Sequence, residues 1–180
     1  TEQHFLPMSI AWLDGGKELL AVSFNNLLLW DTTTGKTIMR AQHVVTAQMQ
    51  SQAQLSPNGQ LLALPQAYSI QLIDTRTGKH LHFLQSNTTK DYFVAMAFSP
   101  DNMHLAAVDI YGHIQIWNVQ NGQAEMAYKL PVSFKQTSGS SPIGLGTWSP
   151  ETPAGLAWSP DGKMLAVTYR GGGLVMLGMA

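Results

Sequence analysis

Cysteine is absent from the 180 residues, and charged residues are scarce. Without thiols the chain forms neither disulfides nor thiolate metal sites, and its redox compartment is left open, with the cytoplasm favoured. Only 12% of the residues are charged, against about 25% in an average soluble domain. Lys and Arg number 10, Asp and Glu number 11, and no run of one sign occurs. This balance argues against nucleic acids and anionic membranes as partners.

Long apolar runs and catalytic motifs are also missing. No stretch approaches the roughly 18 apolar residues of a membrane helix, and the N-terminus lacks the order of a signal peptide. Residues 171–173 are three glycines between expected strands, so they predict a turn and not a phosphate site. His80 and His82 have a spacing that could begin a metal site, but no third ligand is apparent, which favours two polar side chains on an outer strand. We therefore expect no catalytic residues, no cofactor and no metal.

What the sequence does contain is a repeat, marked in three ways. Turns of the type Ser-Pro-Asx-Gly occupy residues 56–59 and 159–162, and Ser-Pro-Asp-Asn occupies 99–102. A large apolar residue precedes each equivalent turn, at intervals of 43, 43 and 60: Trp12, Leu55, Phe98 and Trp158. Triplets of the type Leu-Trp-Asp recur 43 and 44 residues apart, at 29–31, 72–74 and 116–118. Each is followed by a glycine in a hairpin signal: Gly35, Gly78 and Gly122.

Between these markers the segments are typical of strands, and helical periodicity is absent. The expected strands are 8–13, 19–24, 27–31 and 37–41; 47–55, 61–65, 69–74 and 80–85; 93–98, 105–109, 114–118 and 125–129; and 155–158, 165–169 and 173–177. Inner segments such as 61–64 are apolar on both faces, which indicates a sheet covered on both sides. A four-stranded antiparallel meander repeated about every 43 residues predicts an all-β fold, a β-propeller. Its blades would span 7–45, 46–86, 92–130 and 154–180, with an insertion at 131–153 and no outer strand in the last blade.

The residues at 97–101, 156–163, 29–31 and 116–118 resemble the WD40 repeat family, and the likeness covers nearly the whole chain outside the insertion. The resemblance implies blades whose third strand ends in Trp-Asp, in scaffolds for protein complexes and not in enzymes. The chain departs from the family pattern in two respects. Only His4 and His43 remain of the usual Gly-His pair, and the Asp expected between the second and third strands is not clearly placed in any unit. We therefore expect blade cohesion to depend on apolar packing.

The chain begins where a preceding blade would end, and it stops without an outer strand, so it is expected to be a segment of a longer array. Uncovered edges and faces invite association. Two interpretations stay open: a second copy completes an eight-bladed ring as a homodimer, or further blades of a longer chain complete it.

Function is predicted at one rim, where the turns from second to third strands meet the connections between blades. The resemblance to the WD40 family implies that partners bind at this rim. Tyrosine and arginine are common at binding hot spots, so the expected contacts of a protein partner are Tyr68, Tyr92, Tyr111, Arg170 and His43; the alternative is ordinary loop residues. The insertion at 131–153 is interpreted as a surface loop, with a partner-binding flap as the alternative. The leading hypothesis is a non-catalytic protein-interaction scaffold within a regulatory protein or array. The other hypothesis is an enzyme or small-ligand propeller with its site at the central channel.

Overall fold

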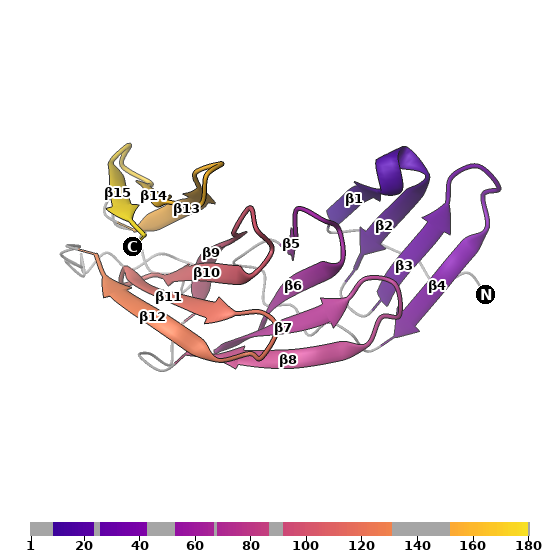
Figure 1. The fold of residues 1–180 in the computed structure, drawn as a ribbon, viewed down its shortest axis with the longest axis horizontal. Helices are drawn as coiled ribbons and strands as arrows, with labels where there is room; N and C mark the ends of the chain where they lie inside the picture. The colour runs from indigo at the N-terminus through magenta and orange to yellow at the C-terminus, as the bar shows by residue number, and fades with distance from the viewer. Residues whose placement is uncertain are drawn as a thin grey trace, which may run out of the picture.

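The computed structural model describes residues 9–23, 26–42, 53–66, 68–86, 92–130 and 152–179. These residues form an all-β fold of four antiparallel sheets, with one short 3-10 turn at Asp14–Gly16 (Figure 1). In this described part, no helix has the length and apolar character that crossing a bilayer requires. Each sheet is a meander in which strands adjacent in sequence pair with one another.

We number the sheets I to IV in chain order. Sheet I contains β1 (Ser9–Leu13), β2 (Glu18–Val22), β3 (Asn26–Asp31) and β4 (Thr37–Gln42). Sheet II contains β5 (Gln54–Leu55), β6 (Leu61–Gln66), β7 (Ser69–Asp74) and β8 (His80–Gln85). Sheet III contains β9 (Phe93–Phe98), β10 (His104–Asp109), β11 (His113–Asn118) and β12 (Ala124–Lys129). Sheet IV contains β13 (Pro153–Trp158), β14 (Met164–Tyr169) and β15 (Leu174–Gly178).

The predicted strands are confirmed. Three predicted ranges, 69–74, 80–85 and 93–98, coincide with the observed strands, and most of the others agree within one or two residues. For the predicted strand at 47–55, the described part is Gln54–Leu55, and residues 47–52 lie outside the described ranges. Sheet IV has three strands in the described part, as predicted.

The Ser-Pro turns are closed by side chains, which is why they mark the strand ends so clearly. The Ser99 hydroxyl donates to Asp101 Oδ1 and accepts the backbone N–H of His104 at 2.9 Å, and Asp101 Oδ1 also accepts the N–H of Met103 at 2.9 Å. The hydroxyls of Ser56 and Ser159 accept the equivalent N–H groups at the same distance. A local motif thus fixes the hairpin between first and second strands in sheets II, III and IV.

A second hydrogen-bonded turn follows the third strand, where the last residue of each triplet at 29–31, 72–74 and 116–118 caps the hairpin that contains the glycine. Asp74 Oδ1 accepts the N–H of Arg76 at 3.0 Å and both the N–H and the hydroxyl of Thr77 at 2.8 Å. Asp31 caps its turn in the same way, and Asn118 does so through its amide oxygen. In each hairpin the glycine takes a φ of 67° to 71°, which a residue with a Cβ adopts only at a cost.

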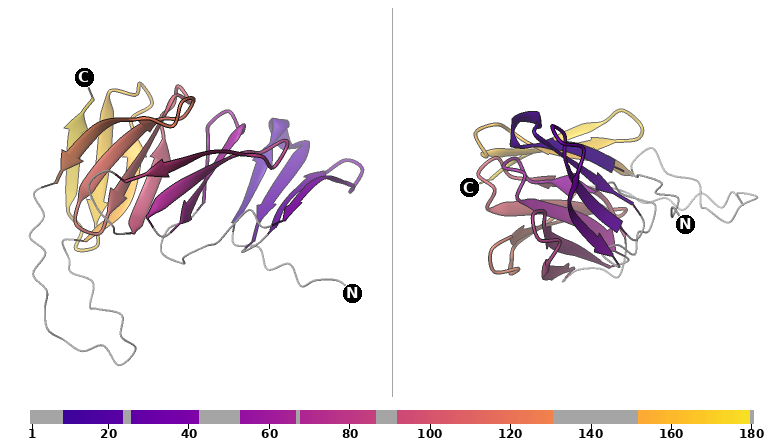
Figure 2. Two further views of the ribbon diagram at one scale, coloured as in Figure 1. Left: turned by 90° about the horizontal axis from the view of Figure 1, so that it is seen from below. Right: turned by 90° about the vertical axis from the view of Figure 1, so that its right-hand side faces the viewer.

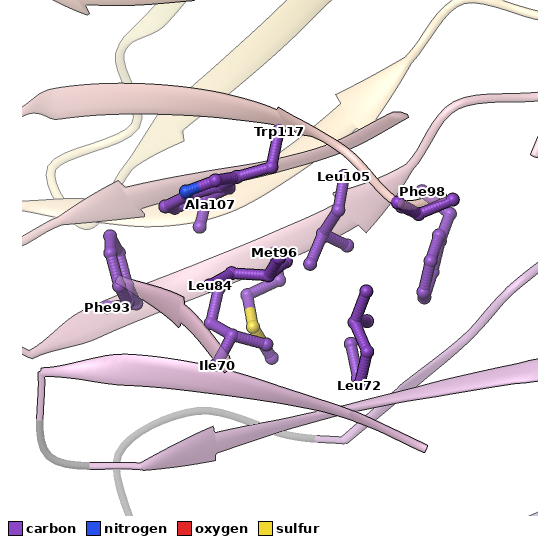
Figure 3. Close-up of a cluster of buried hydrophobic side chains, with 11 residues drawn as sticks. Ile70, Leu72, Leu84, Phe93, Met96, Phe98, Leu105, Ala107 and Trp117 are labelled. Carbon is purple, nitrogen blue, oxygen red and sulfur yellow. The ribbon is translucent and has the colours of Figure 1, made fainter. Parts of the chain in front are cut away.

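The sheets stack face to face, and the cores lie between them. Side chains of sheets I and II form one core, those of sheets II and III a second, and those of sheets III and IV a third. In the second core the indole of Trp117 meets the ring of Phe93 edge-on, with centroids 5.5 Å apart (Figure 3). The Trp117 Nε1–H also donates to the carbonyl of Gln85 at 3.2 Å, across to sheet II. Sheets II and III are thus apolar on both faces, as expected from the sequence.

The four sheets follow one another along an arc, with the first strands on its concave side and the last strands on its convex side (Figure 1). Seen from below, they form a row from sheet I to sheet IV (Figure 2). The sheets thus have the order expected of neighbouring blades. Within the described residues the arc is open, and the structure therefore establishes four stacked antiparallel sheets without establishing a closed propeller.

Candidate partner-binding rim

The turns between second and third strands lie at corresponding ends of sheets that are stacked in one orientation. Leu62, Leu105 and Leu165 are equivalent in the repeat, and each packs into the core that its sheet shares with the preceding sheet. Because the sheets have the same order and orientation, the β6–β7, β10–β11 and β14–β15 turns belong to one rim of the stack. This rim carries Tyr68, Tyr111 and Arg170.

Two of the predicted contacts meet. The rings of Tyr68 and Tyr92 are stacked, with centroids 5.8 Å apart and an interplanar angle of 20°. Tyr68 lies in the β6–β7 turn of sheet II and is 50% exposed, whereas the half-buried Tyr92 directly precedes β9 of sheet III. The pair therefore bridges two neighbouring sheets at the rim, with an aromatic surface open to solvent.

Tyr111 lies in the next turn, which is fixed by a buried carboxylate. Asp109 Oδ1 accepts the backbone N–H groups of Tyr111 at 2.9 Å and of His113 at 2.8 Å. Its Oδ2 lies 2.9 Å from Nδ1 of His113, and Lys129 Nζ lies 2.6 Å from Nε2 of the same ring. The Tyr111 ring contacts His113 at a centroid distance of 6.5 Å. Tyr111 is thus presented by a rigid turn.

Asp109 corrects the sequence analysis, which found no clearly placed Asp between the second and third strands. The third unit has one, with its side chain 1% exposed. The equivalent positions of the other units are Ser23, Gln66 and Tyr169, so the repeat gave no signal at this position. Cohesion in sheet III therefore includes polar contacts to a buried carboxylate as well as apolar packing.

The remaining predicted contacts are Arg170 and His43. Arg170 begins the β14–β15 turn, and its backbone N–H donates to the carbonyl of Thr152 at 3.0 Å. Its neighbour Tyr169 is partly covered, and this burial raises the pKa of the phenol above its usual 10.0. His43 lies outside the described residues, as does most of the insertion at 131–153.

The two histidines of β8 have separate partners. His82 Nε2 lies 2.9 Å from the carbonyl oxygen of Gln120 in sheet III, and the His80 ring packs on Phe83 with centroids 4.0 Å apart. In the part of the chain that the structure describes, no three metal-ligating side chains gather.

The inner edge of the arc carries a hollow over the first strands of sheets II to IV. It is lined by aromatic and aliphatic side chains such as Leu55, Phe98 and Trp158, and by the prolines of the three Ser-Pro turns, Pro57, Pro100 and Pro160. Among the described residues of β1, β5, β9 and β13, none is titratable. These strands therefore bring no acid–base group to the hollow.

Comparison of the chain with protein-family models and with curated proteins finds no match to either. Its function is therefore inferred from the sheets, their turns and their exposed faces.

Proposed function

We propose that this chain is a non-catalytic protein-binding segment of a WD40-type β-propeller, which engages its partner through the rim that carries Tyr68 and Tyr92. The stacked pair is the observation that supports the proposal. Two tyrosines from neighbouring sheets form one platform, and the 50% exposure of Tyr68 leaves it open to a partner. Tyrosine suits such a platform because it contributes a large, rigid surface with a hydroxyl able to form a hydrogen bond.

The platform is held on both sides by ordered structure. Tyr68 lies between the paired strands β6 and β7, and Tyr92 is followed at once by the buried Phe93. Asp109 fixes the next turn along the rim, where Tyr111 lies. Binding at this surface would therefore cost little ordering of side chains. In this proposal Tyr111 and Arg170 extend the contact along the rim, and the partner is a protein.

The alternative of a channel enzyme or ligand site is not favoured by the residues on the inner edge. Such a site needs titratable or polar groups that converge on one point. The hollow over the first strands is lined instead by apolar side chains and prolines, with Gln54 and Ser159 as its polar members.

Site-specific photo-cross-linking in the native host tests the proposal. The chain would carry a photoreactive phenylalanine derivative in place of Tyr68, where half the side chain is exposed. We expect a covalent adduct with a defined protein, and we expect Tyr92→Ala to reduce its yield, because the stacked platform is lost. The probe stays at position 68 in both proteins, so that the two yields differ only through the change at Tyr92.

A matched probe at Leu81, which is 38% exposed on the outer strand β8, serves as the control. The proposal requires that this control does not form the same adduct. Equal yields at both positions, or a yield unaffected by Tyr92→Ala, would refute a rim-specific contact.

A further inference from the structure

The outer faces of sheets I and IV resemble the two sides of the contact between neighbouring sheets within the stack. Sheet I has one face in the core with sheet II, and its other face carries Ile10 and Trp12, which are 63% and 64% exposed. Sheet IV has one face in the core with sheet III, and its other face carries Leu174 and Met176, which are 60% and 57% exposed.

The repeat identifies what each exposed residue would normally contact. In sheet IV, Leu174 pairs with Thr168 and Met176 pairs with Ala166. The same register positions are occupied by Leu27 and Leu29 in sheet I, by Ile70 and Leu72 in sheet II and by Ile114 and Ile116 in sheet III. All six of these side chains are fully buried, at 0% exposure, against the following sheet. The outer face of sheet IV is thus built to receive a following sheet.

The outer face of sheet I carries the residues that pack on a preceding sheet in the other units. Ile10 and Trp12 lie at the repeat positions of Met96 and Phe98 in sheet III and of Leu156 and Trp158 in sheet IV. In both of those sheets the equivalent residues pack into the core shared with the preceding sheet. On the same face of sheet I, Ala21 and Leu28 are already buried, whereas Ile10 and Trp12 remain exposed.

The contact between sheets III and IV provides the template for joining these faces. There Trp158 packs against the core that includes Ala106 and Ile116, and its Nε1–H donates to the carbonyl of Ala97 at 3.0 Å. In the free face of sheet IV the same register positions are Ala157, Ala166 and Met176. Trp12 is the tryptophan at the position of Trp158. The chain thus carries both the tryptophan and an alanine-lined surface of the kind that binds it.

We propose that sheet I of one copy stacks on sheet IV of a second copy, with Trp12 over Ala157, Ala166 and Met176 and its Nε1–H donating to the carbonyl of Ala157. Two copies joined in this way at both ends form a symmetric ring of eight sheets, within the range known for propellers. A second copy is the chosen occupant because the matching tryptophan belongs to this chain. The contact rests on the observed stacking of sheets and not on the proposed rim function; only closure of the ring rests on the proposed propeller.

Light scattering after size-exclusion chromatography, together with sedimentation velocity over a range of concentrations, measures the mass of the chain in solution. We expect the mass of two chains for the wild type.

Trp12→Lys and Met176→Lys each place a charge in the contact and should give single chains, because loss of a buried tryptophan anchor weakens a dimer roughly 30-fold or more. Ile10→Lys serves as a second variant on sheet I should the Trp12 variant fail to fold, as judged by its circular dichroism spectrum. Phe83→Lys, at a 50% exposed site on the outer strand β8, is the matched control and should stay dimeric.

Mixing the two blocked variants separates a head-to-tail contact from a symmetric one. The free sheet I of the Met176→Lys chain can still stack on the free sheet IV of the Trp12→Lys chain, so the mixture should contain two-chain species that neither variant forms alone. A dimer that persists in either variant alone would overturn the proposal, as would a wild type that remains a single chain at every concentration. Larger species that both variants abolish would support the contact while contradicting the closed propeller.

Discussion

Asp109 holds both the backbone and the ring of His113: Oδ1 accepts the backbone N–H at 2.8 Å, and Oδ2 lies 2.9 Å from the ring Nδ1. The same Oδ1 accepts the N–H of Tyr111, so one buried side chain closes the turn between β10 and β11. This turn presents a residue of the proposed rim, so its integrity should affect stability and, if the proposed function holds, recognition of the partner.

Removal of this carboxylate should cost more than removal of an exposed one. Asp109→Ala leaves two backbone N–H groups without an acceptor and is expected to lower the free energy of unfolding by about 2–4 kcal/mol. Asp109→Asn keeps an oxygen for the N–H groups and should cost about half as much. Urea denaturation followed by tryptophan fluorescence measures both, with Asp14→Asn at an exposed carboxylate as the control. Equal losses for Asp109→Ala and the control would show that the turn does not depend on this side chain.

Two hairpin glycines with the same backbone conformation provide a matched pair. Gly35 and Gly78 have φ angles of 68° and 67°, but a Cβ on Gly35 would meet no atom within 4 Å, whereas a Cβ on Gly78 would lie 2.5 Å from Cβ of Ala41 in sheet I. Gly35→Ala should therefore cost about 1 kcal/mol for the left-handed conformation alone. Gly78→Ala should cost roughly 1–3 kcal/mol more, because sheets I and II must move apart. Thermal and urea unfolding check the difference, and equal costs would mean that this close approach of the two sheets is not maintained.

Asn102 combines a left-handed backbone with a contact between turns. Its φ is 63°, and its Oδ1 accepts the N–H of Asn58 in the neighbouring sheet at 2.8 Å. Asn102→Ala loses the contact and strains the turn, for an expected cost of about 1–2 kcal/mol. Asn102→Gly relieves the strain but not the lost contact, so its stability should lie between those of the alanine variant and the wild type. Urea denaturation of the three proteins measures the order of their stabilities. If the glycine variant were no more stable than the alanine variant, the backbone at Asn102 would not be strained.

Acid should destabilise the hairpins through their capping carboxylates. Burial tends to raise the pKa of Asp74, but the hydrogen bonds from Thr77 and Arg76 outweigh it and hold the pKa below its usual 3.8. A carboxyl whose pKa is lower in the folded state contributes stability that is complete above about pH 5 and is lost as the pH falls through the lowered value. The urea midpoint of the wild type should therefore fall between pH 5 and pH 2 more steeply than that of Asp74→Asn.

The two curves should converge at low pH, where the carboxyl is protonated in both folded and unfolded chains. Asp31, whose pKa is lowered mainly by the hydroxyl of Thr33, offers a second position for the same measurement. Parallel curves for the wild type and both variants would show that these caps do not couple folding to protons.

The strands could be predicted from the sequence because their ends are encoded locally. Ser99 and Asp101 close their turn with atoms five residues apart or fewer, and Asp74 caps a hairpin within three residues. Each of these motifs recurs with similar letters in three of the four units, and their spacing gave the strand ranges. The apolar character of both faces gave the stacking, since a sheet of this kind is stable only between two others.

The contacts between sheets could not be predicted in the same way. Tyr68 was expected at the rim, but its stacking on Tyr92 depends on the offset between sheets II and III, which no local pattern encodes. Asp109 was missed because its unit alone has a carboxylate at that turn. The sequence predicted that the end faces are exposed, but it did not predict which residues form them. The register of the strands identified these residues, Trp12 and Met176 among them.

Sheet III differs from the end sheets in being covered on both faces, and this has a consequence for how the molecule opens. In a linear stack each layer is stabilised by its immediate neighbours, so local unfolding begins at the ends and proceeds inward. Backbone amides of β10 and β11 should thus exchange with solvent deuterium most slowly, and those of β15 most rapidly. Occupation of the end faces would erase this gradient, so that the protection pattern itself reports whether the stack has neighbours.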